Sequence, residues 1–132
     1  MKEQLINFET AKLAKEVGFD NGCYHLHGEY DGYVGIHNID NFNRSNDKKQ
    51  YSAPTQSLLQ KWLREEHNIQ VFMKPFYDSK EKKTTFACDI IEIVRSGRVK
   101  KSHRCDTYED ALEEGLVNGL NLVKELNELK DE

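Results

Sequence analysis

The segment CYHLHGEYDGYVGIH places Cys23, His25 and His27 at alternate positions, a spacing that raises the question of a bound metal. Thiolate and imidazole groups are the usual ligands of zinc, and His103 with Cys105 could complete a four-ligand set. Side chains two residues apart on a strand lie about 6 to 7 Å apart, whereas structural zinc sites usually draw close ligand pairs from a turn. We therefore expect no metal and no other cofactor, and Cys23, His25 and His27 are the candidate ligands if a metal is bound.

Thiol chemistry is the second possibility that the residue types raise. A nucleophilic cysteine needs a lowered thiol pKa, a nearby base and an oxyanion hole. Cys88 lies inside an apolar run, which is typical of a small core residue. Cys105 follows Arg104 and precedes an expected helix, a setting that would lower its pKa. No segment holds a complete catalytic set, so we expect no catalytic residue and favour a binding protein over an enzyme.

Basic residues gather near the end of the chain, where they could contact phosphate groups. Residues 79–105 contain eight Lys and Arg against three acidic residues. The candidate nucleic-acid contacts are Arg95, Arg98, Lys100, Lys101 and Arg104. Residues 106–132 contain nine acidic residues against two basic ones and could neutralise this field. An edge strand protected by lysines against aggregation explains the same pattern, so nucleic-acid binding is the alternative function.

Composition limits the class of protein. The chain has 132 residues, 37% of them hydrophobic and 32% charged, with a net charge of −4. This length is sufficient for one domain that folds without disulfides, so we expect a single domain over residues 1–132. No apolar run is long enough for a signal peptide or a membrane span. An odd number of cysteines suits a reducing compartment, and we expect a cytoplasmic protein with no membrane association.

Two segments in the first half have apolar residues at helical spacing. FETAKLAKEVGF predicts a helix over residues 7–17 that ends at Gly18. SAPTQSLLQKWLREEH predicts a helix over residues 54–66, with Ser52 and a first-turn proline as start signals. Between them, Asp31-Gly32 separates two runs of strand-forming residues and predicts a hairpin with a two-residue turn.

That turn sets an expected register in which Tyr30 pairs with Tyr33, and Tyr24 lies on the same face of the hairpin. Tyrosine gives a large contact area at a low cost in side-chain entropy, so Tyr24, Tyr30 and Tyr33 are the predicted partner-binding residues. Packing of this face on the core is the competing interpretation. Residues 41–52 are polar and without period, which predicts a long exposed loop.

The second half predicts three strands and a long helix. IQVFMKPFY, TTFACDIIEIVR and RVKKSHRC form an expected antiparallel meander, with a two-residue turn at Ser96-Gly97 and an edge position for the strand that contains Pro75. The final helix begins after overlapping capping boxes in DTYEDALEE. Gly115 and Gly119 make a smooth groove on it, which predicts close packing on its own sheet or, less commonly, docking of a partner helix.

The blocks FETAKLAKEVGF, YSAPTQSLLQKWLREEHNI and TYEDALEEGL resemble a family of small uncharacterised proteins encoded by bacteriophages, prophages and other mobile elements of gut bacteria. The resemblance spans most of the chain outside residues 24–50. It implies an origin in a phage or integrated element that acts inside a bacterial cell. It carries no catalytic motif and transfers no functional residue.

Together these patterns predict an α+β fold: helix, β-hairpin, helix, three-stranded antiparallel meander and C-terminal helix, with helices packed on one face of the sheet. The leading function is a small cytoplasmic adaptor of a phage or mobile element that binds an unidentified protein partner. The alternative is a nucleic-acid-binding accessory protein that uses the basic hairpin at residues 95–104. A metal-dependent or thiol enzyme is the third possibility.

Overall fold

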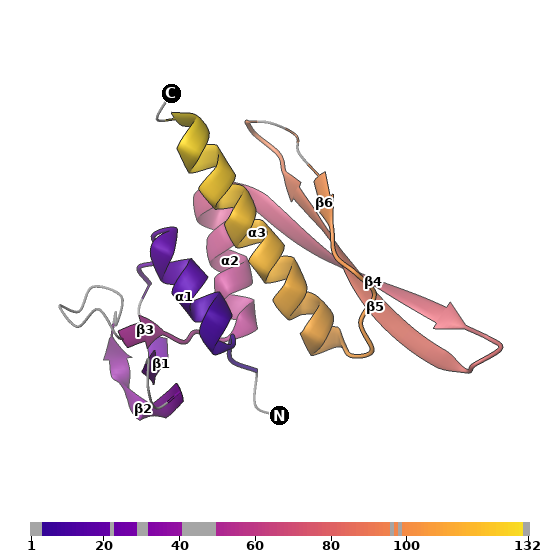
Figure 1. Cartoon of the computed structure of the whole chain (residues 1–132), viewed down its shortest axis with the longest axis horizontal. Coiled ribbons are helices and arrows are strands. Elements are labelled where there is room, and N and C mark those ends of the chain that lie inside the picture. Colours follow the sequence, from indigo (N-terminus) through magenta and orange to yellow (C-terminus); the bar gives the residue numbers. More distant parts are fainter. Residues whose placement is uncertain are drawn as a thin grey trace. The chain divides into compact units, whose positions relative to one another are not determined.

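The computed structural model describes residues 4–21, 23–28, 32–40, 50–95, 97 and 99–130, with side chains at 4–21, 51–95, 97 and 99–128 (Figure 1). The chain forms two compact units, residues 1–59 and 60–132, and the division falls within the second helix. The expectation of a single domain stays a prediction. None of the described helices is long and apolar enough to span a membrane.

The first unit begins with helix α1, Phe8–Glu16, which confirms the helix expected over residues 7–17. Asn7 caps its start, because the side-chain oxygen accepts a hydrogen bond from the Thr10 N–H at 2.9 Å. Gly18 ends the helix with φ +99°, a conformation that glycine adopts without steric penalty. The start and stop signals in the sequence are therefore the ones the structure uses.

A three-stranded sheet with the order β2-β1-β3 follows. Its strands are β1, Cys23–Gly28, β2, Gly32–Asp40, and β3, Gln50–Ser52. The last three residues of the expected loop 41–52 are thus a strand, which pairs antiparallel with β1. Residues 41–49 of that expected loop lie outside the described part of the chain.

The expected hairpin register is wrong next to the turn. Gly28 pairs with Gly32 and His27 with Tyr33, so three residues connect the strands instead of two. Register shifts between Cys23 and Leu26 absorb the difference, and Cys23 pairs with Asp40, as a two-residue turn would require. A bulge adds a residue to one strand, so turn chemistry alone does not fix the pairing along the whole ribbon.

Helix α2, Gln56–His67, starts two residues later than the sequence predicts. Its first turn is capped by Thr55, whose hydroxyl accepts a hydrogen bond from the Leu58 N–H at 3.2 Å. The Pro54 carbonyl instead accepts a hydrogen bond from the Ile6 N–H at 3.0 Å, which holds the N-terminal segment against this turn. The helix buries Trp62 and Leu63 on the expected apolar stripe.

The second unit contains the expected antiparallel meander, with the order β4-β5-β6. Its strands are β4, Ile69–Asp78, β5, Lys83–Glu92, and β6, Val99–Lys101. Pro75 lies on the edge strand β4, as predicted. The expected two-residue turn at Ser96-Gly97 is wrong, because Ile91 already pairs with Val99.

Buried Glu92 explains where β5 ends. Its carboxylate accepts hydrogen bonds from the N–H groups of Val94, at 3.2 Å, and Arg95, at 2.7 Å. These bonds turn the backbone directly after the strand, so residues 93–98 form a longer connection than the Ser-Gly dipeptide suggests. A buried carboxylate needs such partners, since an unpaired one would be strongly unfavourable.

Helix α3, Tyr108–Lys130, lies along one face of this sheet (Figure 1). Thr107 caps it by accepting a hydrogen bond from the Asp110 N–H at 3.1 Å, which is one of the two expected caps. The core between α3 and the sheet is formed by residues Val71, Cys88, Ile90, Ala111, Leu112, Leu116, Leu120 and Val123. The predicted α+β class and order of elements are confirmed.

Two glycines allow α3 to pack closely. A Cβ at Gly115 would lie 2.6 Å from Cys88 Sγ, and one at Gly119 would lie 2.9 Å from Leu63 Cδ1. Neighbours this close leave no room for a side chain at Gly115. The small-residue groove therefore packs against the chain's own sheet and helix α2, which is the first of the two interpretations of this motif.

Candidate functional site

Burial alternates along the strands of the second unit, as expected for a sheet covered on one face. Val71 and Ile90 are buried on the face that α3 covers, whereas the neighbouring Phe72 is 48% exposed. Val99 on β6 is 54% exposed and pairs with the half-buried Ile91. We call the surface formed by Phe72, Ile91 and Val99 the open face.

The open face mixes apolar and polar side chains, because Ile91 lies between Gln70 and Val99 in the register and Asp89 lies between Phe72 and Lys101. Lys74 forms an ion pair with Asp89, which is the cross-strand partner of both Phe72 and Lys101. Lys101 is exposed and lies two residues along β6 from Val99. Exposed groups of apolar side chains with a polar rim are typical of surfaces that contact other proteins. The sequence contains a signal for an exposed apolar face, because IQVFMKPFY is apolar at successive positions and not only at alternate ones.

The predicted tyrosine surface falls on a part of the chain where side chains are not described. Tyr24 and Tyr33 lie on β1 and β2, and Tyr30 lies outside the described residues. The backbone pairs Tyr33 with His27, so the pairing of Tyr30 with Tyr33 that motivated the hypothesis is wrong. Partner binding through these tyrosines stays a prediction.

The four predicted nucleic-acid contacts that the structure describes do not lie on one ribbon face. Lys100 forms an ion pair with Glu125 of α3 at 2.6 Å, so its charge is directed toward the helix. Lys101, the next residue, lies on the opposite side of β6 by strand alternation. Arg104 lies over the Phe76 ring, 4.1 Å from its centroid, and Arg95 follows the end of β5. Arg98 lies outside the described residues.

Neither described cysteine has the environment of a nucleophile. Cys88 is buried, and its thiol donates to the Ala111 carbonyl at 3.2 Å. Burial raises the pKa of Cys88 to about 11, which leaves almost no thiolate at neutral pH. This agrees with the interpretation of Cys88 as a core residue.

Cys105 was expected to have a lowered pKa, and this expectation is wrong. Desolvation raises its pKa, and so does Glu114, whose carboxylate accepts a hydrogen bond from the thiol at 3.4 Å. The same carboxylate accepts a hydrogen bond from the His103 N–H at 2.9 Å and lies 2.8 Å from the His103 ring. Desolvation and a negative charge against the sulfur together oppose thiolate formation.

Among the described side chains, no group of three His, Cys, Asp or Glu residues could hold a metal ion. His103, Cys105 and Glu114 are close, but the carboxylate is committed to hydrogen bonds with the other two. The side chains of Cys23, His25 and His27 lie outside the described part of the chain, so they stay the candidate metal ligands that the sequence indicates.

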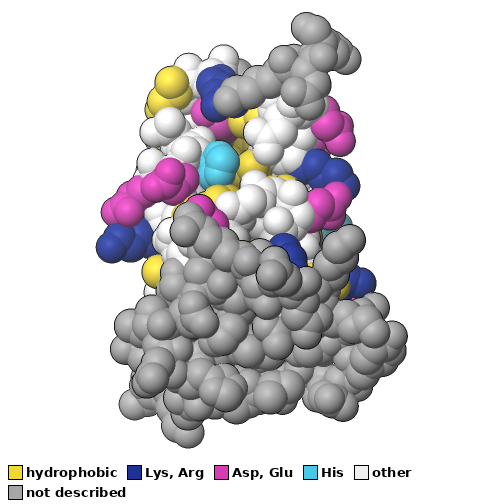
Figure 2. Space-filling model, turned by 90° about the vertical axis from the view of Figure 1, so that its left-hand side faces the viewer, with side chains coloured by type: hydrophobic (Ala, Val, Ile, Leu, Met, Phe, Trp, Pro, Cys, Tyr) yellow, Lys and Arg dark blue, Asp and Glu magenta, His cyan; other side chains and the backbone are white. Residues whose placement is uncertain are grey.

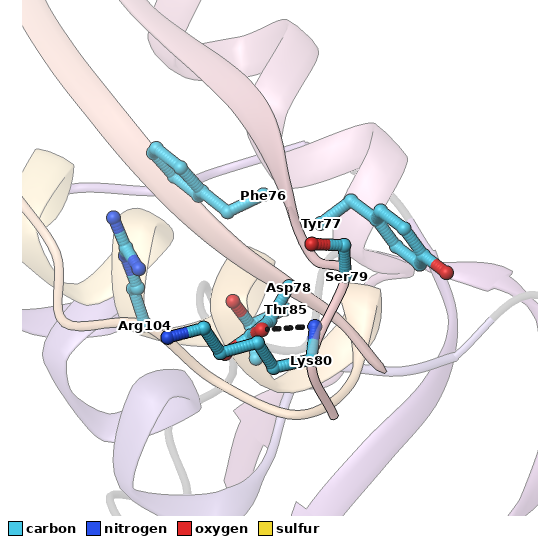
Figure 3. A pocket seen from close by; sticks show the side chains of 7 residues that line it. All are labelled: Phe76, Tyr77, Asp78, Ser79, Lys80, Thr85 and Arg104. Atoms are coloured by element: carbon cyan, nitrogen blue, oxygen red, sulfur yellow. Dashed lines mark hydrogen bonds between the residues drawn. The ribbon is translucent and has the colours of Figure 1, made fainter. Parts of the chain in front are cut away.

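The β4–β5 hairpin extends past the first turn of α3 (Figure 1), and a recess that was not predicted from the sequence lies at its tip. We call it the tip recess. It has a volume of about 420 Å³ and is lined by Phe76, Tyr77, Asp78, Ser79, Lys80, Thr85 and Arg104. In Figure 3 the Phe76, Lys80 and Arg104 side chains gather around it, whereas the Tyr77 ring points away.

The cause of the recess is tertiary. Cys105 and Phe86 exchange backbone hydrogen bonds of 2.7 and 2.9 Å, which bring Arg104 beside the hairpin tip. Asp78 shapes the turn by accepting hydrogen bonds from the N–H groups of Lys80 and Glu81. The DSKEKK turn signal was visible in the sequence, but the placement of Arg104 against it was not.

Charge on the surface is mixed. On the side of the molecule drawn in Figure 2, the described Lys and Arg side chains lie among Asp and Glu, without a large patch of one sign. This arrangement does not favour a long track for phosphates on that side.

Comparison of the chain with models of known protein families, with curated proteins and with solved structures finds no match.

Proposed function

We propose that the protein is a small cytoplasmic adaptor of a phage or mobile element, and that it acts by binding another protein through the open face. The observation that carries this proposal is the exposure of Phe72 and Val99 on a sheet whose other face forms the core. Two other apolar side chains, Ile93 and Val94, are 58% and 67% exposed where β5 ends, outside the open face. Burial of Phe72 and Val99 in a partner is favourable by about 25 cal/mol per Å² of apolar surface.

The charges around the open face indicate the kind of partner. Lys101 and Arg95 are exposed and flank its apolar residues along the chain. A partner surface with an apolar centre and acidic residues at its edge would complement both features. Nucleic acid fits less well, because the predicted phosphate contacts are dispersed over different surfaces and one of them, Lys100, is paired with Glu125.

Capture of a partner from lysate of a gut bacterium tests the proposal, with variants that alter the open face alone. We expect Phe72→Ser combined with Val99→Ser to abolish capture, because polar hydroxyls replace the apolar contact. Val94→Ser is the matched control, since Val94 is even more exposed, at 67%, but is not part of the open face. All variants should melt within a few degrees of the wild type, as substitutions of exposed residues usually do.

Each outcome has a defined meaning. Capture that survives the double substitution contradicts the proposal. Capture that disappears after nuclease treatment, or with Arg95→Glu and Lys101→Glu but not with the serine variants, favours the nucleic-acid alternative. Dimers of the purified wild type that the serine substitutions dissociate would identify a second copy of the chain as the occupant of the open face.

A further inference from the structure

We propose that the tip recess binds a nucleotide unit, with its phosphate between Arg104 and Lys80 and its base against Phe76. This inference concerns a surface other than the open face and does not depend on the proposed protein contact. It rests on the unpaired donors of the recess, on its charge and on its size.

The first observation is a set of donors without acceptors. The Arg104 guanidinium lies on the Phe76 ring, which fixes its plane and leaves the N–H groups at its edge available. Among the described residues, neither Arg104 nor Lys80 has a side-chain hydrogen bond or an ion pair. The hydroxyl groups of Ser79 and Thr85 line the same recess and can also donate.

The second observation is the direction of the two cationic side chains. Figure 3 shows the Arg104 guanidinium directed toward Phe76 and the Lys80 ammonium beside the Arg104 side chain, so that the two cationic side chains lie on the same side of the recess. Like charges that share a site repel each other, and an anion between them removes the repulsion. A planar guanidinium suits two oxygens of one anion, and an ammonium supplies a point charge to a third. A phosphate has three such oxygens, whereas a carboxylate has two.

The third observation is the size of the recess and its apolar wall. Its volume of about 420 Å³ exceeds what a phosphate ion needs. Pockets for small organic molecules commonly occupy about 300 to 1,000 Å³. One face of the Phe76 ring carries the Arg104 guanidinium, and stacking of a base on an aromatic ring or on a guanidinium plane is a common mode of nucleotide recognition. A phosphate carried by a nucleotide therefore fits both parts of the recess.

Asp78 is the feature that opposes an anion, and it supplies a sensitive test. One of its oxygens accepts hydrogen bonds from the N–H groups of Lys80, at 2.9 Å, and Glu81, at 3.3 Å. Asparagine keeps an oxygen for these bonds but removes the charge. Asp78→Asn should therefore strengthen the binding of an anion and weaken the binding of a cation, without loss of the turn.

The experiment is titration of the full-length protein with adenosine monophosphate, inorganic phosphate, a short single-stranded oligonucleotide and a phosphoserine peptide, followed by NMR shifts of backbone amides. We expect adenosine monophosphate to shift residues of the tip recess and to bind more tightly than inorganic phosphate. Arg104→Gln and Lys80→Gln should each weaken binding roughly tenfold, since a charge-assisted hydrogen bond is lost. Asp78→Asn should tighten it.

Arg64→Gln is the matched control, because it removes one exposed positive charge from helix α2, which leads into the end of β4 opposite to the tip. It should leave the affinity unchanged, and an equal loss would overturn the proposal by showing a general charge effect. The Lys80 variant guards against misfolding of the Arg104 variant, because Lys80 lies in an exposed turn. Tighter binding of the oligonucleotide identifies a nucleic acid as the source of the nucleotide unit, and equal binding identifies a free nucleotide.

Three results would overturn the proposal. The first is the absence of saturable shifts at the tip recess with either nucleotide ligand. The second is equal affinity for inorganic phosphate and adenosine monophosphate, which would exclude a contact with the base. The third is binding of the phosphoserine peptide at the recess without binding of the nucleotides, which would assign the site to a phosphorylated protein.

Discussion

At the scale of single residues, desolvation and a neighbouring carboxylate determine the reactivity of a cysteine. Cys105 has a basic neighbour and precedes a helix, two features that lower a thiol pKa. The carboxylate of Glu114, nine residues later in the chain, lies 3.4 Å from the Cys105 sulfur and raises the thiol pKa. The Glu114 carboxylate itself is stabilised: burial alone would raise its pKa, but hydrogen bonds from His103 and Cys105 lower it.

The first prediction concerns the reactivity of Cys105. Glu114→Gln removes the charge that helps to raise the thiol pKa, so the pKa should fall and the thiolate fraction at pH 8 should rise. We expect faster alkylation of Cys105 by iodoacetamide, measured on the Cys105 peptide by mass spectrometry over a range of pH. Cys88 should stay unreactive because it is buried and has a pKa of about 11.

Glu128→Gln is the control for this prediction, since Glu128 is exposed on the same helix and far from the thiol. It should leave the alkylation rate of Cys105 unchanged. If Glu114→Gln leaves the rate unchanged as well, Glu114 does not control the thiol.

At the scale of elements, one contact sets how closely α3 lies on the sheet. Gly115 faces Cys88, and the space for a side chain there is filled by the sulfur and by Val71. Gly119 faces the end of the Leu63 side chain, which can change rotamer. Interiors are packed closely enough that a single methyl group at the first position has a measurable effect.

The second prediction compares the two glycines. Gly115→Ala should destabilise the protein by about 1 to 3 kcal/mol, the usual effect of overpacking a rigid contact. Gly119→Ala should be close to neutral, because movement of Leu63 relieves the contact and alanine adds about 1 kcal/mol of helix propensity. Urea denaturation of both variants measures the difference. Equal free energies of unfolding would show that the contact between α3 and β5 is not tight.

At the scale of the whole molecule, basic and acidic residues of the second unit offset each other. The basic segment 79–105 precedes the acidic segment 106–132, and Lys83 with Asp106 and Lys100 with Glu125 join the two. Binding surfaces are consequently local: the open face carries exposed apolar side chains, and the tip recess has a small excess of positive charge. Long-range attraction of a nucleic acid needs a broad positive field, which these pairs reduce.

The third prediction is that the purified protein contains no stoichiometric zinc. The spacing of Cys23, His25 and His27 on strand β1 lacks the close ligand pair of a structural site. Elemental analysis of protein prepared without chelators measures the metal content directly. One zinc per chain that is lost with His25→Ala and His27→Ala would contradict the prediction and make β1 the metal site.

Much of the fold was determined by local sequence. Helix α1 ends at Gly18 because glycine tolerates the left-handed conformation there, and α3 begins after Thr107 because its hydroxyl caps the first turn. The meander and the edge position of Pro75 also follow from the sequence, since strand periodicity and the missing N–H act within a few residues. Each of these features depends on interactions between chain neighbours.

Only the tertiary structure decided the hairpin registers and the candidate sites. Extra residues in β2 moved Tyr33 opposite His27, and the buried Glu92 replaced a two-residue turn by a longer connection. The tip recess exists because Cys105 pairs with Phe86, a residue nineteen positions earlier, and so brings Arg104 to Phe76. Contacts between distant positions depend on how whole elements pack, and no local pattern of residues encodes that packing.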